Sequence, residues 1–368
     1  MFDRSDLQAA VGAGVLDNTT AARLEAFVAS RRGGNALGDG ESLRFLANFN
    51  DIFISIGMVL LLAGVTSLSS SLFMGSGVPN GITFAAMVLP AMAVAWGLSE
   101  YFCARRRLLL PSIVLCAAFC VLAGVLGSFL FGEQAVRNIE NLGFTQSFRA
   151  LGNLGLVGTG SVGVAAIAYF LRFRLPFSLF VLALALAGMA YAGVAFFGDA
   201  GLLIGGTLSL LVGVVTLGAA IAIDAGDPGR ATRRSDFGFW LHLAAAPQII
   251  LGLRGLTVGF FGEGESFGTA FILLASLLGF AFLSLALNRR ALIVSSLLTY
   301  GVALTALIGG LGLSMVNTTI FTLLVLGASV VIVGGGWSTA RRLVLSVLPR
   351  GGLMSRVFPD EPMPLARA

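Results

Sequence analysis

The sequence predicts an all-α, polytopic membrane protein: a bundle of about ten transmembrane helices with a small helical hairpin at its N-terminus. Composition is the first reason, because hydrophobic residues make up 57% of the 368 residues and charged residues only 11%. The mean hydropathy is +0.94, and a soluble domain of this length does not expose so little charge. The second reason is a series of apolar runs, and the third is the placement of the arginines between them.

The first 34 residues read as a cytoplasmic helical hairpin. Gly12 and Gly14 interrupt a first apolar face, and Asp17 or Asn18 is placed to cap the helix that follows. Two short helices bury little surface by themselves. We therefore expect the hairpin to pack on a protein partner, on a second copy of the chain or on its own membrane domain.

A linker and a juxtamembrane amphipathic segment over residues 35–50 lead into a membrane domain over residues 51–342. Each apolar run in that domain is close to the roughly 20 residues that a spanning helix needs. The ten runs cover residues 52–72, 81–103, 108–131, 153–171, 175–197, 200–223, 237–261, 267–287, 291–313 and 316–337. The prolines that follow predict a mostly disordered cytoplasmic tail over residues 343–368.

The arginines predict the orientation. All 23 basic residues are arginine, and their clusters fall after the second, fourth, sixth, eighth and tenth runs. The positive-inside rule therefore places both termini in the cytoplasm of a cell whose inner membrane holds the chain. Clusters of this kind between apolar runs are an orientation signal, so the excess charge of +5 does not indicate nucleic-acid binding.

The arginine corners also resemble one another in sequence. A serine follows four or five residues after the arginines Arg107, Arg174, Arg290 and Arg342. This likeness indicates an array of repeated helical hairpins. The alternative is that all helices entering from the cytoplasm share the same end chemistry.

The stretch from Ser235 to Gly262 is the first place to look for a functional site. It contains the single histidine, His242, about 9 Å into the helix after Asp236, and Gln248 near mid-depth. Pro247 cannot donate to the Leu243 carbonyl, which predicts a bend and an acceptor that a side chain or water must satisfy.

Two further ionisable side chains need partners at this stage. We expect Arg254, about 27 Å along the same helix, to extend to the outer surface or to meet Glu263 or Glu265. Near the opposite interface, Glu100 is expected to pair with Arg105–Arg107 or with a neighbouring arginine corner.

Several segments resemble a known bacterial family. The N-terminal hairpin, with Asp6–Leu16 and Ala22–Phe27, together with Leu43–Phe53 and Trp240–Pro247, is similar to the family catalogued as domain of unknown function 2157. Members of that family are multi-pass membrane proteins. The resemblance implies the same architecture and brings no assigned activity.

Small residues predict where helices approach each other closely. Gly158–Gly163 matches a dinucleotide fingerprint, but it lies within a spanning helix whose amides are already bonded. We read it instead as part of a packing stripe of Gly155, Thr159 and Gly163, matched by Gly205, Ser209 and Gly213. Cys103, Cys116 and Cys120 show no metal spacing and are expected to fill helix contacts.

The sequence favours a non-catalytic membrane protein that uses its hairpin for partner contact or regulation. One histidine and no carboxylate pair at mid-depth leave acid–base and metal schemes without enough groups, so we predict no enzyme activity and no cofactor. The alternative is a transporter of a small or lipidic solute, with a path along Pro247 and Gln248. A polar cavity reaching His242 and Gln248 would favour the transporter; a solidly packed bundle with an exposed apolar face on the hairpin would favour the first function.

Overall fold

The computed structural model describes residues 11–17, 19–21, 24, 49–73, 81–137, 144–196, 201–227, 234–257, 267–289 and 291–348. These residues form helices and connecting turns, with no strand among them. The chain divides into two compact units, one of Met1–Ser42 with Asp360–Ala368 and the other of Leu43–Pro359. We call the second the membrane unit.

The helices of the membrane unit follow the predicted apolar runs. They are α3 (Phe49–Phe73), α4 (Gly81–Ser99), the π-helix η3 (Glu100–Arg105), α5 (Leu109–Arg137), α6 (Phe144–Phe173), α7 (Pro176–Gly193), the 3-10 turn η5 (Val194–Phe196), α8 (Gly201–Ala225), α9 (Arg234–Thr257), α10 (Phe267–Leu287), α11 (Ala291–Gly309), α12 (Met315–Gly335) and α13 (Trp337–Val347).

Eight helices in the described part of the chain are long and apolar enough to cross a membrane. They correspond to α3 to α9 and α12. The two other predicted runs coincide with α10 and α11, which have 21 and 19 residues. The all-helical membrane architecture is therefore supported, while the count of ten crossings stays a prediction.

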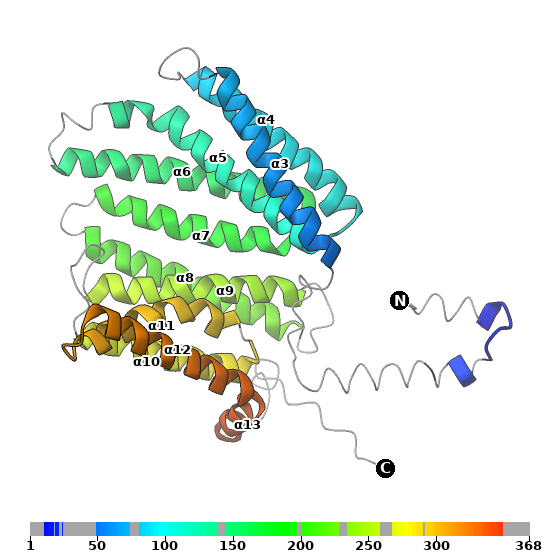
Figure 1. Ribbon diagram of the computed structural model, residues 1–368, viewed down its shortest axis with the longest axis vertical. Coiled ribbons are helices and arrows are strands. Elements are labelled where there is room, and N and C mark those ends of the chain that lie inside the picture. Colours follow the sequence, from blue (N-terminus) through cyan, green and yellow to red (C-terminus); the bar gives the residue numbers. More distant parts are fainter. Residues whose placement is uncertain are drawn as a thin grey trace. The chain divides into compact units, whose positions relative to one another are not determined.

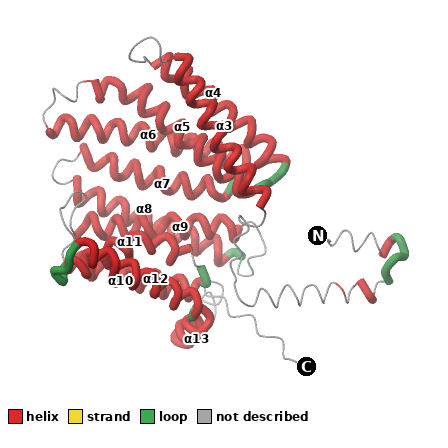
Figure 2. The backbone as a smooth tube through the Cα atoms, in the orientation of Figure 1, coloured by secondary structure: helices red, strands yellow, loops and turns green. Residues whose placement is uncertain are grey.

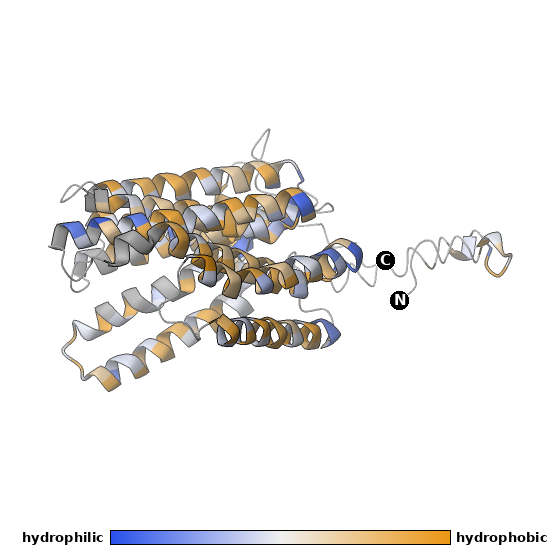
Figure 3. Cartoon of the chain, turned by 90° about the horizontal axis from the view of Figure 1, so that it is seen from above, coloured by the Kyte–Doolittle hydropathy of each residue, from blue (hydrophilic) through white to orange (hydrophobic). Residues whose placement is uncertain are grey.

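Consecutive helices pack against each other, and Figure 1 shows α4 to α9 following one another in chain order, with α10, α11 and α12 grouped beyond α9. Their connections alternate between two ends. Figure 2 shows the α4–α5, α6–α7 and α10–α11 turns at one end and the α11–α12 turn at the other. The helices are apolar over most of their length, with hydrophilic residues gathered toward helix ends (Figure 3). The α4–α5, α6–α7 and α10–α11 arginine corners thus share one end of the unit.

The likeness of these corners extends to the backbone. Arg107, Arg174 and Asn288 each adopt a left-handed conformation, with φ of 55°, 50° and 52°. Such a residue ends a helix so that the chain can reverse. The serines that follow each bond back to a leucine carbonyl, three of them at the start of the next helix and Ser346 in the last turn of α13. These bonds are Ser112 to Leu108, Ser178 to Leu175, Ser295 to Leu292 and Ser346 to Leu343.

The small-residue stripe of α6 lies at a tight helix crossing, as predicted. A Cβ added at Gly188 of α7 would lie 2.6 Å from Thr159, and one at Gly155 would lie 3.0 Å from Ala192. Gly158 faces the other way, toward Ser128 of α5. This segment is therefore a two-sided packing surface within a continuous helix, which leaves no backbone amides for a nucleotide phosphate.

The cysteines lie in an aromatic core between α4, α5, α6 and α7. Cys116 and Cys120 are buried there, and none of the three cysteines forms a disulfide. Tyr169 is fully buried in the same cluster and donates to Ser99 Oγ over 2.9 Å. This cross-helix bond was not foreseen from the sequence, because a lone tyrosine in an apolar run carries no positional signal.

The C-terminal end of the membrane domain differs from the prediction. Residues 343–347, assigned to the disordered tail, belong to the helix α13. Gly334–Gly336 end α12, and the next eleven residues, Trp-Ser-Thr-Ala-Arg-Arg-Leu-Val-Leu-Ser-Val, have apolar and polar faces. That pattern forms a short amphipathic helix once the chain has turned. The residues after 348 lie outside the described part.

The described residues of the N-terminal unit contain the predicted break and cap. Gly14 has a φ of +71°, and the Asp17 carboxylate accepts a hydrogen bond from the Thr20 amide over 3.3 Å. Hydrogen bonds from the Thr19 and Thr20 side chains lower the pKa of Asp17 from 3.8 to about 2. Asp17 is therefore the N-cap of the second helix. The rest of the predicted hairpin lies outside the described residues.

Candidate functional site

The site is built on the close approach of α8 to α9. A Cβ at Gly252 of α9 would lie 2.6 Å from the Leu210 nitrogen, and one at Gly213 of α8 would lie 2.8 Å from the Ile249 nitrogen. Gly206, which was not part of the predicted stripe, is also close to the α9 backbone, since its added Cβ would lie 2.9 Å from the Leu256 nitrogen. Only glycine permits such approach, which brings the polar side chains of the two helices within bonding distance.

Gln248 of α9 is fully buried in a network that joins three helices. Its Nε2 donates to the Ala183 carbonyl of α7 over 3.1 Å, and its Oε1 accepts from Thr216 of α8 over 3.4 Å. The Gln248 carbonyl accepts from Ser209 Oγ over 2.8 Å, and Ser209 in turn bonds Tyr191 over 2.6 Å. Each polar end of the amide thus has a protein partner, and the side chain is 1% exposed.

Pro247 lies within a helix that continues on both sides of it. Near Pro247, the Ser209 hydroxyl donates a hydrogen bond to the carbonyl of Gln248 and not to that of Leu243. Ser209 therefore ties α8 to α9 one residue beyond the predicted acceptor. The predicted bend stays a prediction.

A second polar cluster lies at the arginine-corner end of the same helices. Arg289, whose side chain is 2% exposed, holds the Asp224 carboxylate with two bonds: Nε to Oδ2 over 2.8 Å and Nη2 to Oδ1 over 2.6 Å. The same Nη2 also lies 3.1 Å from the Ser235 carbonyl. One guanidinium therefore joins the end of α8, the start of α9 and the α10–α11 corner.

His242 stands beside this ion pair and is fully buried. Its Nδ1 lies 2.7 Å from the Gly238 carbonyl, which places a proton on Nδ1, and 3.8 Å from Asp224 Oδ2. Gly238 is where a Cβ would collide with the Asp224 carboxylate. The sequence drew attention to His242 but took Asp224 as the start of a loop and Arg289 as an orientation charge.

The chemistry open to this cluster is limited by its own bonds. Both oxygens of the Asp224 carboxylate are occupied by the guanidinium of Arg289. In the described part of the chain, no three His, Cys, Asp or Glu side chains gather as a metal site requires. The cluster is thus arranged to hold three helix ends together.

The other two predicted site residues lie apart from this cluster. Glu100, in η3, pairs with Arg172 over 2.5 Å, so its partner is the neighbouring corner, the second of the two expected choices. Both side chains are well exposed, which makes the pair worth little. Arg254 is half-buried near the far end of α9, and its expected partners Glu263 and Glu265 lie outside the described residues.

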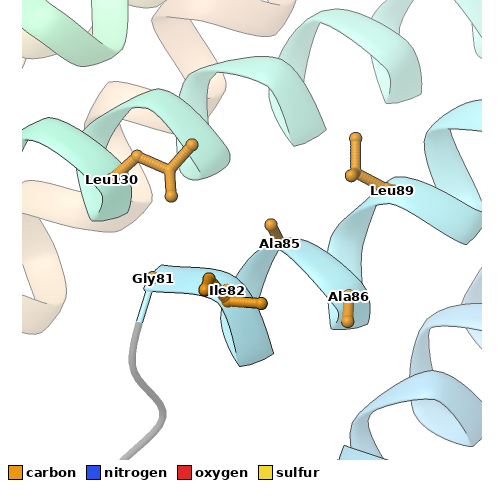
Figure 4. Close-up of a pocket in the computed structure, with 6 residues that line it drawn as sticks. All are labelled: Gly81, Ile82, Ala85, Ala86, Leu89 and Leu130. Carbon is orange, nitrogen blue, oxygen red and sulfur yellow. The ribbon is translucent and has the colours of Figure 1, made fainter.

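Two cavities are described, and neither is lined by a residue of α9. One, of about 710 Å³, lies between α4 and α5 and is lined only by apolar residues, as Figure 4 shows. The other, of about 390 Å³, lies among α10, α11, α12 and the start of α13. His242 and Gln248 are packed against protein instead of lining either space.

No family model, no curated protein and no solved structure matches this chain. The resemblance to domain of unknown function 2157 therefore stays a prediction.

Proposed function

We propose that this protein is a non-catalytic scaffold of the bacterial inner membrane. Its ten helices cross the bilayer, its arginine corners and both termini face the cytoplasm, and its N-terminal hairpin binds a protein partner. Helices of this composition are compatible with an integral membrane protein.

The environment of Gln248 carries the choice of a scaffold over a transporter. A solute path along α9 requires this amide to face water or a ligand. Its Nε2 and Oε1 instead bond Ala183 and Thr216, and its surface is 1% exposed. The polar midpoint of α9 therefore supports packing, the role expected of a solid bundle.

The hairpin supplies the contact surface in this proposal. Val15 is 76% exposed and Leu24 is 40% exposed, so apolar side chains of this segment face away from their own unit. Exposed apolar groups on a small polar segment are typical of an interaction site.

The orientation is tested with reporter tags at both termini and in two connections, residues 133–149 and 224–234. The proposal expects the termini and the second connection to report from the cytoplasm and the first connection from the opposite side. Reports from one compartment for both connections contradict the ten-crossing arrangement.

The partner contact is tested with a photo-crosslinking residue placed at Val15 or Leu24 in intact cells. The expected result is one protein adduct of defined mass at both positions. The matched control is Thr20, an exposed polar position on the same segment. Equal adducts at Thr20, or adducts to lipid alone, contradict a protein-binding role for the hairpin.

A further inference from the structure

A half-open cavity lies among α10, α11 and α12, and Trp337 at the start of α13 also lines it. Its volume is about 390 Å³, and aliphatic residues such as Leu278, Leu297 and Val330 form most of its wall, with Trp337 at one end. That volume is within the range of small-molecule pockets, about 300–1,000 Å³. The cavity is therefore large enough to hold part of a small ligand.

The two hydroxyl groups in its wall are already bonded to protein. Ser329 donates to the Val325 carbonyl over 2.7 Å, so the hydroxyl of Tyr300, 3.2 Å away, donates to Ser329 Oγ. The wall around them therefore suits a hydrocarbon chain better than a polar solute.

The cavity lies in the half of the bundle that contains the arginine corners. Its lining on α11 runs from Ile293, the third residue of that helix, to Tyr300, the tenth. Seven residues correspond to about 10 Å along the helix axis. The chain that fits here thus extends from the corner end toward mid-depth, as an acyl chain of one leaflet does.

The helix α13, whose first residue lines this cavity, carries positive charge. Trp337 lines the cavity and donates from Nε1 to Asn288 Oδ1 over 3.2 Å, which fixes the start of α13 to the α10–α11 corner. The only charged residues of α13 are Arg341 and Arg342, and Arg342 is exposed. Leu343 and Val347 are exposed at four-residue spacing, as on a helix that lies in the membrane surface.

We propose that this cavity binds one anionic phospholipid, with an acyl chain among α10, α11 and α12 and the phosphate beside Arg342. The hydrocarbon wall selects a lipid chain, and Arg342 in the middle of α13 selects an anionic headgroup over a zwitterionic one. Under the orientation proposed above, this lipid belongs to the cytoplasmic leaflet. The existence of the site does not depend on that orientation.

The test uses the purified full-length protein in nanodiscs containing phospholipids with brominated acyl chains, which quench tryptophan fluorescence on contact. The contribution of Trp337 is the difference between the native chain and Trp337→Phe. Brominated phosphatidylglycerol should quench Trp337 more strongly, at equal mole fraction, than brominated phosphatidylcholine. One exposed arginine near a membrane surface corresponds to a preference of about fivefold.

Two variants with matched controls separate the chain from the headgroup. Gly334→Leu fills the cavity from α12, where an added Cβ meets nothing within 4 Å, and Gly327→Leu makes the same change two turns earlier, in equally open space that does not line the cavity. For the headgroup, Arg342→Gln is compared with Arg105→Gln, an exposed arginine of another corner.

Gly334→Leu should reduce the quenching of Trp337 by both lipids, and Arg342→Gln should abolish the preference for phosphatidylglycerol alone; the two controls should behave as the native chain. Equal quenching in Gly334→Leu and Gly327→Leu overturns the cavity assignment. Equal quenching of the native chain by the two lipids overturns the anionic headgroup. Nanodiscs expose both leaflets alike, so a failure here is distinct from a failure of the sidedness tags.

Discussion

Replacing Asp224 with asparagine isolates the ion pair that joins α8, α9 and the α10–α11 corner. The change keeps the size of the side chain but removes its charge, and it leaves the guanidinium of Arg289 buried with 2% of its side chain exposed. Removing one partner of a buried ion pair costs about 3–5 kcal/mol, because the remaining charge loses its compensation. At about 2 °C per kcal/mol for a large chain, the melting temperature should fall by roughly 6–10 °C.

The chain contains its own reporter for this measurement. Cys116 and Cys120 are 0% and 1% exposed, so a thiol-reactive fluorescent dye labels them only when the bundle opens. The melting temperature is read from dye fluorescence during heating of the detergent-solubilised protein. The matched control is Glu100→Gln, which breaks an ion pair whose two side chains are 36% and 53% exposed. An exposed pair contributes about 0–1 kcal/mol, so this control should shift the melting temperature little.

A second substitution decides whether the loss comes from an uncompensated charge. The double variant Asp224→Asn with Arg289→Gln removes both charges, and replacement of a whole buried pair is often close to neutral. The double variant should therefore be more stable than Asp224→Asn alone. The reasoning is refuted if the double variant is less stable than both the native chain and Asp224→Asn. It is also refuted if Asp224→Asn and Glu100→Gln shift the melting temperature equally.

Three further predictions follow from the same structure. Gln248→Leu should cost about 0.5–2 kcal/mol in the same dye assay, because it removes cross-helix hydrogen bonds of a packed side chain; a loss above about 4 kcal/mol would contradict a packing role. Gly252→Ala should destabilise the α8–α9 contact, because its Cβ would lie 2.6 Å from the Leu210 nitrogen, whereas Gly218→Ala meets nothing within 4 Å and should stabilise α8 by up to about 1 kcal/mol. Finally, hydrogen bonds lower the pKa of Asp17 from 3.8 to about 2. The stabilisation that Asp17 provides as the N-cap is therefore complete above pH 3.8 and is lost as the pH falls through about 2. A carboxyl NMR titration of Asp17 measures this pKa, and a midpoint near 3.8 would contradict the capping role.

The corners of the bundle were largely readable in the sequence, because helix ends in a membrane protein carry polar signals. The arginine clusters marked every second connection, and the structure adds that the serines after them bond back to leucine carbonyls. The stripe of Gly155 and Thr159 was likewise visible, since small residues at four-residue spacing have few uses in lipid other than close packing.

Which side of each spanning helix faces protein was not readable in this way. In a soluble helix the buried face is the apolar one, but here lipid and protein interior are both apolar, and α8 is hydrophobic on all sides. The sequence therefore singled out His242 and Gln248 as polar atoms at membrane depth without indicating what they touch. Whether Gln248 lines a path or bonds Ala183 depends on a neighbour 65 residues away.

The sequence by itself determined the composition of the bundle, the approximate ends of its helices and the residues that need a partner. The tertiary structure decided the partners. Asp224 and Arg289 lie 65 positions apart, one at a helix end and one in a corner, and each alone looks like an interfacial charge. They become a buried pair only because Gly238 lets α9 approach the Asp224 carboxylate, a contact between elements that no local pattern encodes.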